Sequence, residues 1–196
     1  MNLPNSLSVT RICLVPLLVV VLLTKFEGRQ ILGIPTELVG AGIFGLASLT
    51  DWADGYLARR RKQITALGQV IDPLADKLLT SAAFISLVQM GLAPAWMVAV
   101  IIGREFAVTA LRSLTYARGV AIPASGLGKI KMIAQVVAIL ALILSSAGGA
   151  ADRLWWVGQA ALWIVVVTAL ASAADYFRRF TLFSRNDVVT RDDRVA

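Results

Sequence analysis

The sequence predicts an all-α, polytopic membrane protein of about six transmembrane helices. Of its 196 residues, 58% are hydrophobic, and the mean hydropathy is +0.75, which exceeds what a soluble core needs. Long runs contain no Asp, Glu, Lys or Arg, as a hydrocarbon environment requires; they are 12–24, 78–102 and 133–147. Short turns separate predicted helices that are each near the about 20 residues a bilayer requires.

The predicted helices cover most of the chain. We expect them at residues 12–26, 37–61, 72–90, 95–117, 130–146 and 154–176. The third is expected to begin at Asp72 and Pro73, because aspartate is a common N-cap and proline favours the first helical turn. Residues 1–183 then form one membrane domain, and 184–196 form a polar C-terminal tail that we expect to be disordered.

Small residues indicate where these helices approach one another. Gly40, Gly42 and Gly45 in the second span have the spacing of a close helix contact. The segment 91–94 is a tight, uncharged turn containing glycine and proline. It therefore predicts that the third and fourth spans are antiparallel neighbours.

Charge sets the expected orientation. The cations predicted to share one side of the membrane are 59–62, 118, 129, 131, 178, 179 and 185, against 25, 29 and 153 on the other. Cytoplasmic loops collect Lys and Arg, so both termini are expected in the cytoplasm and the protein in the cell (inner) membrane. These loops lie next to anionic lipid, and their Lys and Arg residues account for the net charge of +7. No soluble basic domain is evident, which argues against nucleic acid as a partner.

Four carboxylates stand together in this apolar chain. Asp51 and Asp54 are three residues apart, and Asp72 and Asp76 are four apart, so each pair shares one face of a helix. Mg²⁺ prefers carboxylate oxygens combined with substrate phosphate oxygens, and paired ions can hold both oxygens of an in-line displacement. The chain has no His, and Cys13 is its only cysteine, which excludes a His-ligated zinc site and an internal disulfide.

Each aspartate also has a simpler explanation. Asp72 could only cap the helix at Pro73, and Asp51 or Asp54 could pair with nearby Arg59 or Lys62. Acids near or within spans are costly and usually functional, however. Four of them at this spacing favour a functional site that faces the cytoplasm.

The segment 51–76 matches D-x2-D-G-x2-A-R-x8-G-x3-D-x3-D at every fixed position. It resembles the signature of the CDP-alcohol phosphotransferase family, whose members are membrane enzymes that use a divalent metal. The resemblance implies two ions of Mg²⁺ or Mn²⁺ held by Asp51, Asp54, Asp72 and Asp76. It also implies that Asp76 is the catalytic general base. The residues resembling the CDP-binding positions are Gly55, Ala58, Arg59, Gly68 and, more weakly, Thr65.

Several cations interrupt the apolar sequence further along. They are Arg104, Arg112, Lys129 and Lys131. Cations converging beside a metal–diphosphate site imply a second anionic substrate, so we interpret these four as binding the phosphate of the acceptor. An internal ion pair is the alternative for Arg104, since ions inside a membrane protein are usually paired.

The resemblance extends over essentially the whole chain up to the fifth span. The runs 72–77, 104–105, 111–112 and 128–131 look like the branch of the family that uses glycerol 3-phosphate, with one departure at Met132, where a small polar residue is expected. The resemblance implies a homodimer that transfers the phosphatidyl group of CDP-diacylglycerol to sn-glycerol 3-phosphate, giving phosphatidylglycerophosphate and CMP in phospholipid biosynthesis.

Two other functions remain open from the sequence. The first is the same chemistry with phosphatidylglycerol or inositol phosphate as the acceptor. The second is a small cation transporter, since intramembrane acids also mark ion paths. Against a transporter, all four aspartates are crowded at one membrane side, and no repeat mirrors them.

Overall fold

The computed structural model describes most of the chain. The backbone is described for residues 3–24, 30–31, 33–61, 66–117, 127–147 and 151–192. Side chains are described for residues 10–24, 30–31, 33–50, 74–111, 113, 130–147 and 152–178.

The described backbone consists of helices and one short hairpin. In chain order the elements are α1 (Leu3–Leu23), β1 (Gln30–Ile31), β2 (Ile34–Pro35), α2 (Thr36–Arg61), α3 (Ala66–Gln89), α4 (Ala95–Ala117), α5 (Leu127–Ser145) and α6 (Ala151–Asp192). The strands are antiparallel, with Ile31 opposite Ile34. Gly33 between them has a φ of 79°, a conformation that glycine adopts readily. The all-α class is thus confirmed, apart from a hairpin too short to show a strand pattern.

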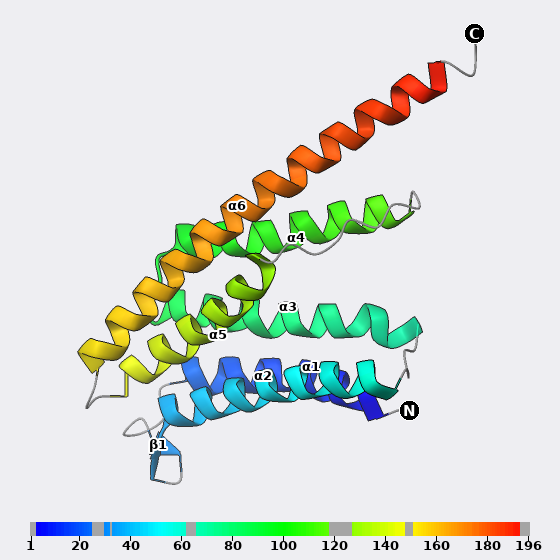
Figure 1. Ribbon diagram of the computed structural model, residues 1–196. Helices are drawn as coiled ribbons and strands as arrows, with labels where there is room; N and C mark the ends of the chain where they lie inside the picture. The colour runs from blue at the N-terminus through cyan, green and yellow to red at the C-terminus, as the bar shows by residue number, and fades with distance from the viewer. Residues whose placement is uncertain are drawn as a thin grey trace.

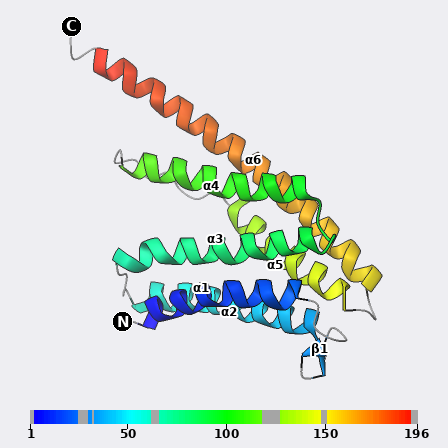
Figure 2. The same cartoon turned by 180° about the vertical axis from the view of Figure 1, so that it is seen from behind.

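Successive helices run in opposite directions, so the chain passes up and down between two ends (Figure 1). The N-terminus of α1 and the C-terminus of α6 lie at the same end, which Figure 2 shows from behind. Helix α3 contacts α1, α2, α4 and α5, while α5 packs most extensively against α6. The last part of α6 extends away from the other helices. The start of α1 and the end of α6 therefore lie at one end of the molecule, and the side of a membrane that this end would face stays a prediction.

One helix among the described residues is long and apolar enough to cross a membrane, by length and composition: the segment Asp152–Arg178 of α6. Shorter apolar helices in the same part of the chain are Thr10–Leu23, Thr36–Thr50 and Ile130–Ser145. Tryptophans gather near the start of α6, where Trp155 and Trp156 make an edge-to-face contact with a ring-centroid distance of 4.8 Å. Tryptophan is typical of the membrane–water interface.

The core is formed by side chains from all six helices. Its largest fully buried side chains include Phe44, Phe84, Leu87, Leu142 and Leu162. Many large apolar side chains elsewhere on these helices are exposed. Among the described side chains, each helix therefore has an apolar outer face as well as an apolar inner face, as helices of a membrane-associated protein do.

The predicted glycine contacts are found at two of three positions. A Cβ on Gly40 would lie 2.4 Å from a side-chain carbon of Leu22, so α1 and α2 approach closely there. At Gly45 the nearest side-chain atom, from Leu140 of α5, would be at an ordinary 3.8 Å. At Gly42 a Cβ would meet nothing within 4 Å. The expectation for Gly42 is therefore wrong within the described residues, because its side of α2 faces outward.

The turn between α3 and α4 is built as predicted. Gly91 has a φ of 75°, and its N–H bonds to the carbonyl of Val88 (3.0 Å) while Leu92 N–H bonds to that of Leu87 (2.9 Å). This pair of bonds is the Schellman ending of a helix, which requires the left-handed conformation at the glycine. The carbonyl of Pro94 then accepts the first bond of α4, from Met97 N–H (3.1 Å). The prediction of antiparallel neighbours and the bounds 95–117 are confirmed.

Three predicted boundaries are corrected. Helix α1 begins at Leu3 rather than near residue 12, and α3 begins at Ala66, so Pro73 lies well inside it and Asp72 is not its cap. A proline inside a membrane helix is tolerated because neighbouring groups satisfy the freed backbone carbonyl. The tail from Ser184 was expected to be disordered, yet α6 continues to Asp192. Extending an existing helix adds one hydrogen bond per residue without a new nucleus.

Candidate active site

The four signature aspartates belong to two consecutive helices. Asp51 and Asp54 lie in the C-terminal half of α2, and Asp72 and Asp76 lie in the N-terminal half of α3. The two helices are in contact, and these halves lie at the same end of the molecule as both termini (Figure 1). The fold therefore brings the two acid pairs to one end, on adjacent antiparallel helices.

The structure describes the side chains of Asp76, Arg104 and Lys131 among the predicted site residues. The others fall outside the described side chains: Asp51, Asp54, Gly55, Ala58, Arg59, Gly68, Asp72, Arg112 and Lys129 on helices, and Thr65 between α2 and α3. Their roles remain predictions.

Asp76 lies at the edge of the buried face of α3. Its neighbours Ala75 and Leu79 are fully buried, whereas Leu74 is exposed, and Asp76 itself is half-buried between these two environments. One turn further along, the hydroxyl of Thr80 donates to the backbone carbonyls of Asp76 (2.9 Å) and Lys77 (3.3 Å). At this position the packed core next to Asp76 restricts its side chain, while the exposed side of the helix leaves the carboxylate open to a substrate.

Helix α4 carries two charges on its buried stripe. Arg104 and Glu105 lie between Ile101 and Val108, which are 1% and 4% exposed, and the four residues have the spacing of one helix face. The side chains of Arg104 and Glu105 are only 10% and 19% exposed. Charges this deep are stable only when paired and hydrogen-bonded.

The partners come from α5 and α6. Lys131 is 6% exposed and lies on the stripe of α5 that continues through Ala138 into the core. Ser172 is 1% exposed and lies on the buried stripe of α6 between Ala169 and Tyr176. The buried stripe of α5 thus carries two polar residues, Lys131 and Gln135, and that of α6 carries Ser172.

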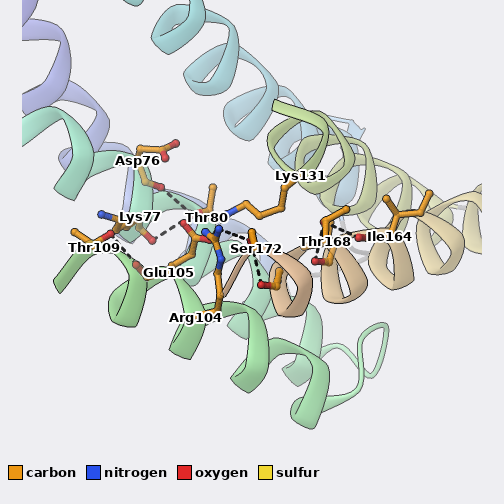
Figure 3. A network of polar contacts seen from close by, with 12 residues as sticks. Asp76, Lys77, Thr80, Arg104, Glu105, Thr109, Lys131, Ile164, Thr168 and Ser172 are labelled. Atoms are coloured by element: carbon orange, nitrogen blue, oxygen red, sulfur yellow. Dashed lines mark hydrogen bonds and ion pairs between the residues drawn. The ribbon is translucent and has the colours of Figure 1, made fainter. Parts of the chain in front are cut away.

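These side chains form one network, shown in Figure 3. Arg104 Nη1 donates to Oε1 of Glu105 at 2.9 Å, and its Nη2 donates to Oγ of Ser172 at 2.5 Å. The Lys131 ammonium donates to the same Oε1 of Glu105. Ser172 in turn donates its only proton to the carbonyl of Ala169 (3.1 Å). Four polar side chains from three helices are therefore joined through one carboxylate oxygen and one hydroxyl.

The four side chains of the network, counted without Asp76, carry a net positive charge. Two cations share the single carboxylate of Glu105, and Nε of Arg104 is buried with no hydrogen-bond partner among the described residues. Asp76 lies on α3, which packs against both α4 and α5, and its side chain is drawn with the network in Figure 3. A buried excess of cationic donors beside a carboxylate on α3 is suited to binding an anionic group next to a base.

The structure brings together three predicted site residues and adds two that the sequence prediction did not include. The ion pair considered for Arg104 exists, with its own neighbour Glu105 as the partner. Glu105 interrupts an apolar run and could have been found from that signal. Ser172 lies in an alanine-rich stretch of α6, and no feature of the neighbouring sequence distinguishes it from a small residue that only packs between helices.

The donor set of the signature fits a hard divalent cation. All four of its acidic side chains offer carboxylate oxygens, and the chain contains no histidine to favour a softer metal. Asp76 is the one member whose side chain the structure describes. Within the described side chains no group of three or more potential metal ligands gathers.

Comparisons with known proteins agree with these features. The family model for CDP-alcohol phosphatidyltransferase matches residues 1–187. The chain is 46% identical over 183 residues to a CDP-diacylglycerol–glycerol-3-phosphate 3-phosphatidyltransferase of Bacillus subtilis, covering 91% of this chain and 94% of that protein. A protein of the same name from Rickettsia bellii is 35% identical, covering 90% and 94%.

A third relative has a different name. The chain is 38% identical over 178 residues to a probable phosphatidylglycerophosphate synthase of Mycobacterium tuberculosis, covering 91% of this chain and 81% of that protein. The matches run through the acid signature on α2 and α3 and the polar network on α4 and α5. The chain belongs to the CDP-alcohol phosphatidyltransferase family.

Proposed function

We propose that this protein transfers the phosphatidyl group of CDP-diacylglycerol to sn-glycerol 3-phosphate, releasing CMP and forming phosphatidylglycerophosphate. The complete acid signature and the names of relatives up to 46% identical support this activity. The observation that carries the choice of acceptor is the pair of cations, the largely buried Arg104 and the buried Lys131, on α4 and α5, which both pack against the helix of Asp76.

Asp51, Asp54, Asp72 and Asp76 are proposed to hold two divalent ions, Mg²⁺ or Mn²⁺. When bound, such ions neutralise a diphosphate and help a phosphate leaving group depart. Carboxylates on two adjacent helices are the donors that hard cations prefer. Gly55, Ala58, Arg59, Thr65 and Gly68, which lie in or between the same helices, are proposed to receive the CDP moiety, because small residues admit a nucleotide and the arginine meets its charge.

Asp76 is proposed to be the general base. It takes the proton of the acceptor hydroxyl, whose oxygen then forms a bond to the lipid-side phosphorus of the donor while the bond from that phosphorus to the CMP oxygen breaks. An alcohol is a weak nucleophile until a positioned base removes its proton, whereas CMP leaves as a stable phosphate with little acid assistance.

The acceptor site is proposed to consist of Arg104, Arg112, Lys129 and Lys131. Glycerol 3-phosphate brings a terminal near-dianion, and burying it requires more than one fixed cation. Phosphatidylglycerol brings only one lipid phosphate to the same place. In the described part of this site, Arg104 and Lys131 share the carboxylate of Glu105, so a phosphate placed there would meet donors from two cations.

The membrane arrangement is part of the proposal. Helices α1 to α6 are proposed to cross the cell (inner) membrane as about six spans, with both termini and the active-site cavity on the cytoplasmic side and a homodimer as the assembly. The alternating helix directions and the common end of the two termini support it, and so do the cations concentrated at that end.

Purified protein in detergent, given CDP-diacylglycerol and one of several acceptors, tests the function directly. We expect CMP release with glycerol 3-phosphate, almost none with glycerol, and loss of the reaction when a chelator removes Mg²⁺ and Mn²⁺. Equal rates with phosphatidylglycerol, inositol phosphate or glycerol would refute the acceptor assignment. Uptake of a divalent cation into proteoliposomes without CDP-lipid would instead favour a transporter.

A further inference from the structure

The polar network on α4, α5 and α6 contains more than the two cations that the acceptor requires. Ser172 is buried and Glu105 is largely buried, with a side chain 19% exposed, and each contacts Arg104 through a different nitrogen. Neither belongs to the acid signature on α2 and α3 or to the proposed acceptor cations. Their arrangement has to be explained separately from the chemistry at Asp76.

Glu105 determines the separation of the two cations. Arg104 Nη1 and the Lys131 ammonium bond to the same oxygen, so their nitrogen atoms lie within about 6 Å of each other, twice the length of an ordinary hydrogen bond. At that separation one phosphate group can accept hydrogen bonds from both. Two buried cations so close would repel strongly without an anion between them, and the Glu105 carboxylate supplies that anion.

Ser172 determines how the guanidinium of Arg104 is turned. Its proton is committed to the carbonyl of Ala169 within α6, so its oxygen faces Arg104 only as an acceptor. With Nη1 on Glu105 and Nη2 on Ser172, the planar guanidinium is fixed at two points. Nε remains buried without a partner among the described residues, and of the five N–H groups of the guanidinium only two make these bonds, so the oriented group keeps N–H donors for a ligand.

We propose that Glu105 and Ser172 are positioning residues of the acceptor site, which hold Arg104 and Lys131 in place for the phosphate of the acceptor alcohol. The inference rests on the proposed function. It makes α6 part of the site, although α6 lies far from the signature in sequence. Side chains that orient a site in this way act through the groups they hold, without touching the reacting atoms.

The test measures Michaelis constants in detergent for Glu105→Ala, Glu105→Gln and Ser172→Ala. The control is Ser145→Ala, which removes a buried hydroxyl that donates to a carbonyl three residues earlier, as Ser172 does, but at the far end of α5. We expect Glu105→Ala to raise the KM for glycerol 3-phosphate about 10- to 100-fold, as losing an orienting partner does elsewhere. The KM for CDP-diacylglycerol should change by less than about threefold, because the donor is held by α2 and α3.

The milder variants separate positioning from folding. Glu105→Gln keeps an oxygen that accepts hydrogen bonds but lacks the charge, so its KM for glycerol 3-phosphate should lie between wild type and Glu105→Ala. Ser172→Ala should raise that KM about 3- to 10-fold, the loss of one orienting hydrogen bond, and Ser145→Ala should leave it unchanged. If Glu105→Ala does not survive purification, Glu105→Gln and Ser172→Ala carry the test.

The outcomes distinguish this inference from the proposed function. If wild type releases CMP with glycerol 3-phosphate while all three variants keep the wild-type KM, the inference is wrong and the function stands. A lower KM in Glu105→Ala would show that Glu105 competes with the acceptor, which also refutes positioning. Equal increases in both Michaelis constants with a lower unfolding temperature would show a purely structural role. No CMP release by wild type with glycerol 3-phosphate would refute function and inference together.

Discussion

Arg104 on α4 and Ser172 on α6 are joined by a hydrogen bond of 2.5 Å between Nη2 and Oγ, although 68 residues separate them in the chain. The bond links the ion pair of Arg104 and Glu105 to α6. Because the same guanidinium also bonds Glu105, the side chain of Arg104 spans the contact between α4 and α6. A substitution of Arg104 is therefore expected to alter both the packing of α4 on α6 and the binding of the acceptor.

The first prediction concerns the shape of this side chain. Arg104→Lys keeps the charge but replaces the two donor nitrogens that bond Glu105 and Ser172 with a single ammonium nitrogen, which lacks the planar fork of a guanidinium and cannot reproduce the geometry of both bonds. We expect the KM for glycerol 3-phosphate to rise by about tenfold, equivalent to about 1.4 kcal/mol, with the donor KM nearly unchanged. Steady-state kinetics in detergent measure both. Wild-type kinetics in Arg104→Lys would show that charge alone suffices.

The second prediction concerns the base. Asp76→Asn should lower kcat by about 10²–10⁴, the usual contribution of a general base, while the affinity for CDP-diacylglycerol stays largely intact. Asp51→Asn should instead shift the dependence on metal concentration and weaken donor binding. Asp152→Asn, an exposed acid in the first turn of α6, is the matched control. Near-normal turnover of Asp76→Asn at saturating metal would remove the assignment.

The third prediction concerns Arg112, whose role rests on the sequence alone. If it binds the acceptor phosphate, Arg112→Ala should cost about 2–5 kcal/mol in kcat/KM for glycerol 3-phosphate, as for losing one partner of a buried charge-assisted contact. Arg153→Ala, an exposed cation near the start of α6 at the opposite end, should have no such effect. A change confined to the kinetics of CDP-diacylglycerol would contradict the role proposed for Arg112.

The fourth prediction concerns the packing of α5 on α6. A Cβ at Gly158 would lie 2.6 Å from Cγ of Leu142 and 3.2 Å from its backbone nitrogen, and Leu142 is fully buried. Gly158→Ala should therefore destabilise the fold by about 1–3 kcal/mol, the usual cost of overpacking. Gly42→Ala, where a Cβ meets nothing within 4 Å, should be neutral or stabilising. Thermal unfolding in detergent compares them, and equal midpoints would disprove the close contact.

The fifth prediction concerns topology. In a Cys13→Ser background, single cysteines at Lys62 and Ala196 should react with impermeant reagents only from the cytoplasmic side. A cysteine at Ile34, which is 49% exposed in the hairpin, should react only from the other side. These opposite results follow from the proposed orientation, which the alternating helix directions and the distribution of cations support. Labelling of Lys62→Cys from outside would reverse the proposed orientation.

Most of the helical architecture could be predicted because its signals are local. The turn at Gly91 and Pro94 fixed the end of α3 and the start of α4, since a left-handed glycine and a proline each restrict the backbone within a few residues. Boundaries failed where a local signal was ambiguous. Pro73 was interpreted as a helix start, but α3 begins at Ala66 and passes through it.

The sequence by itself determined the helical class and the acid signature of the family, because charge-free runs and the spacing of Asp51 to Asp76 are properties of consecutive residues. The tertiary structure alone decided that Lys131 and Arg104 share Glu105, and that Ser172 completes their network. These contacts join α4, α5 and α6, and no pattern in one helix specifies which residue of another it will face. A buried charge needs a partner, yet only the packed helices show which one it has.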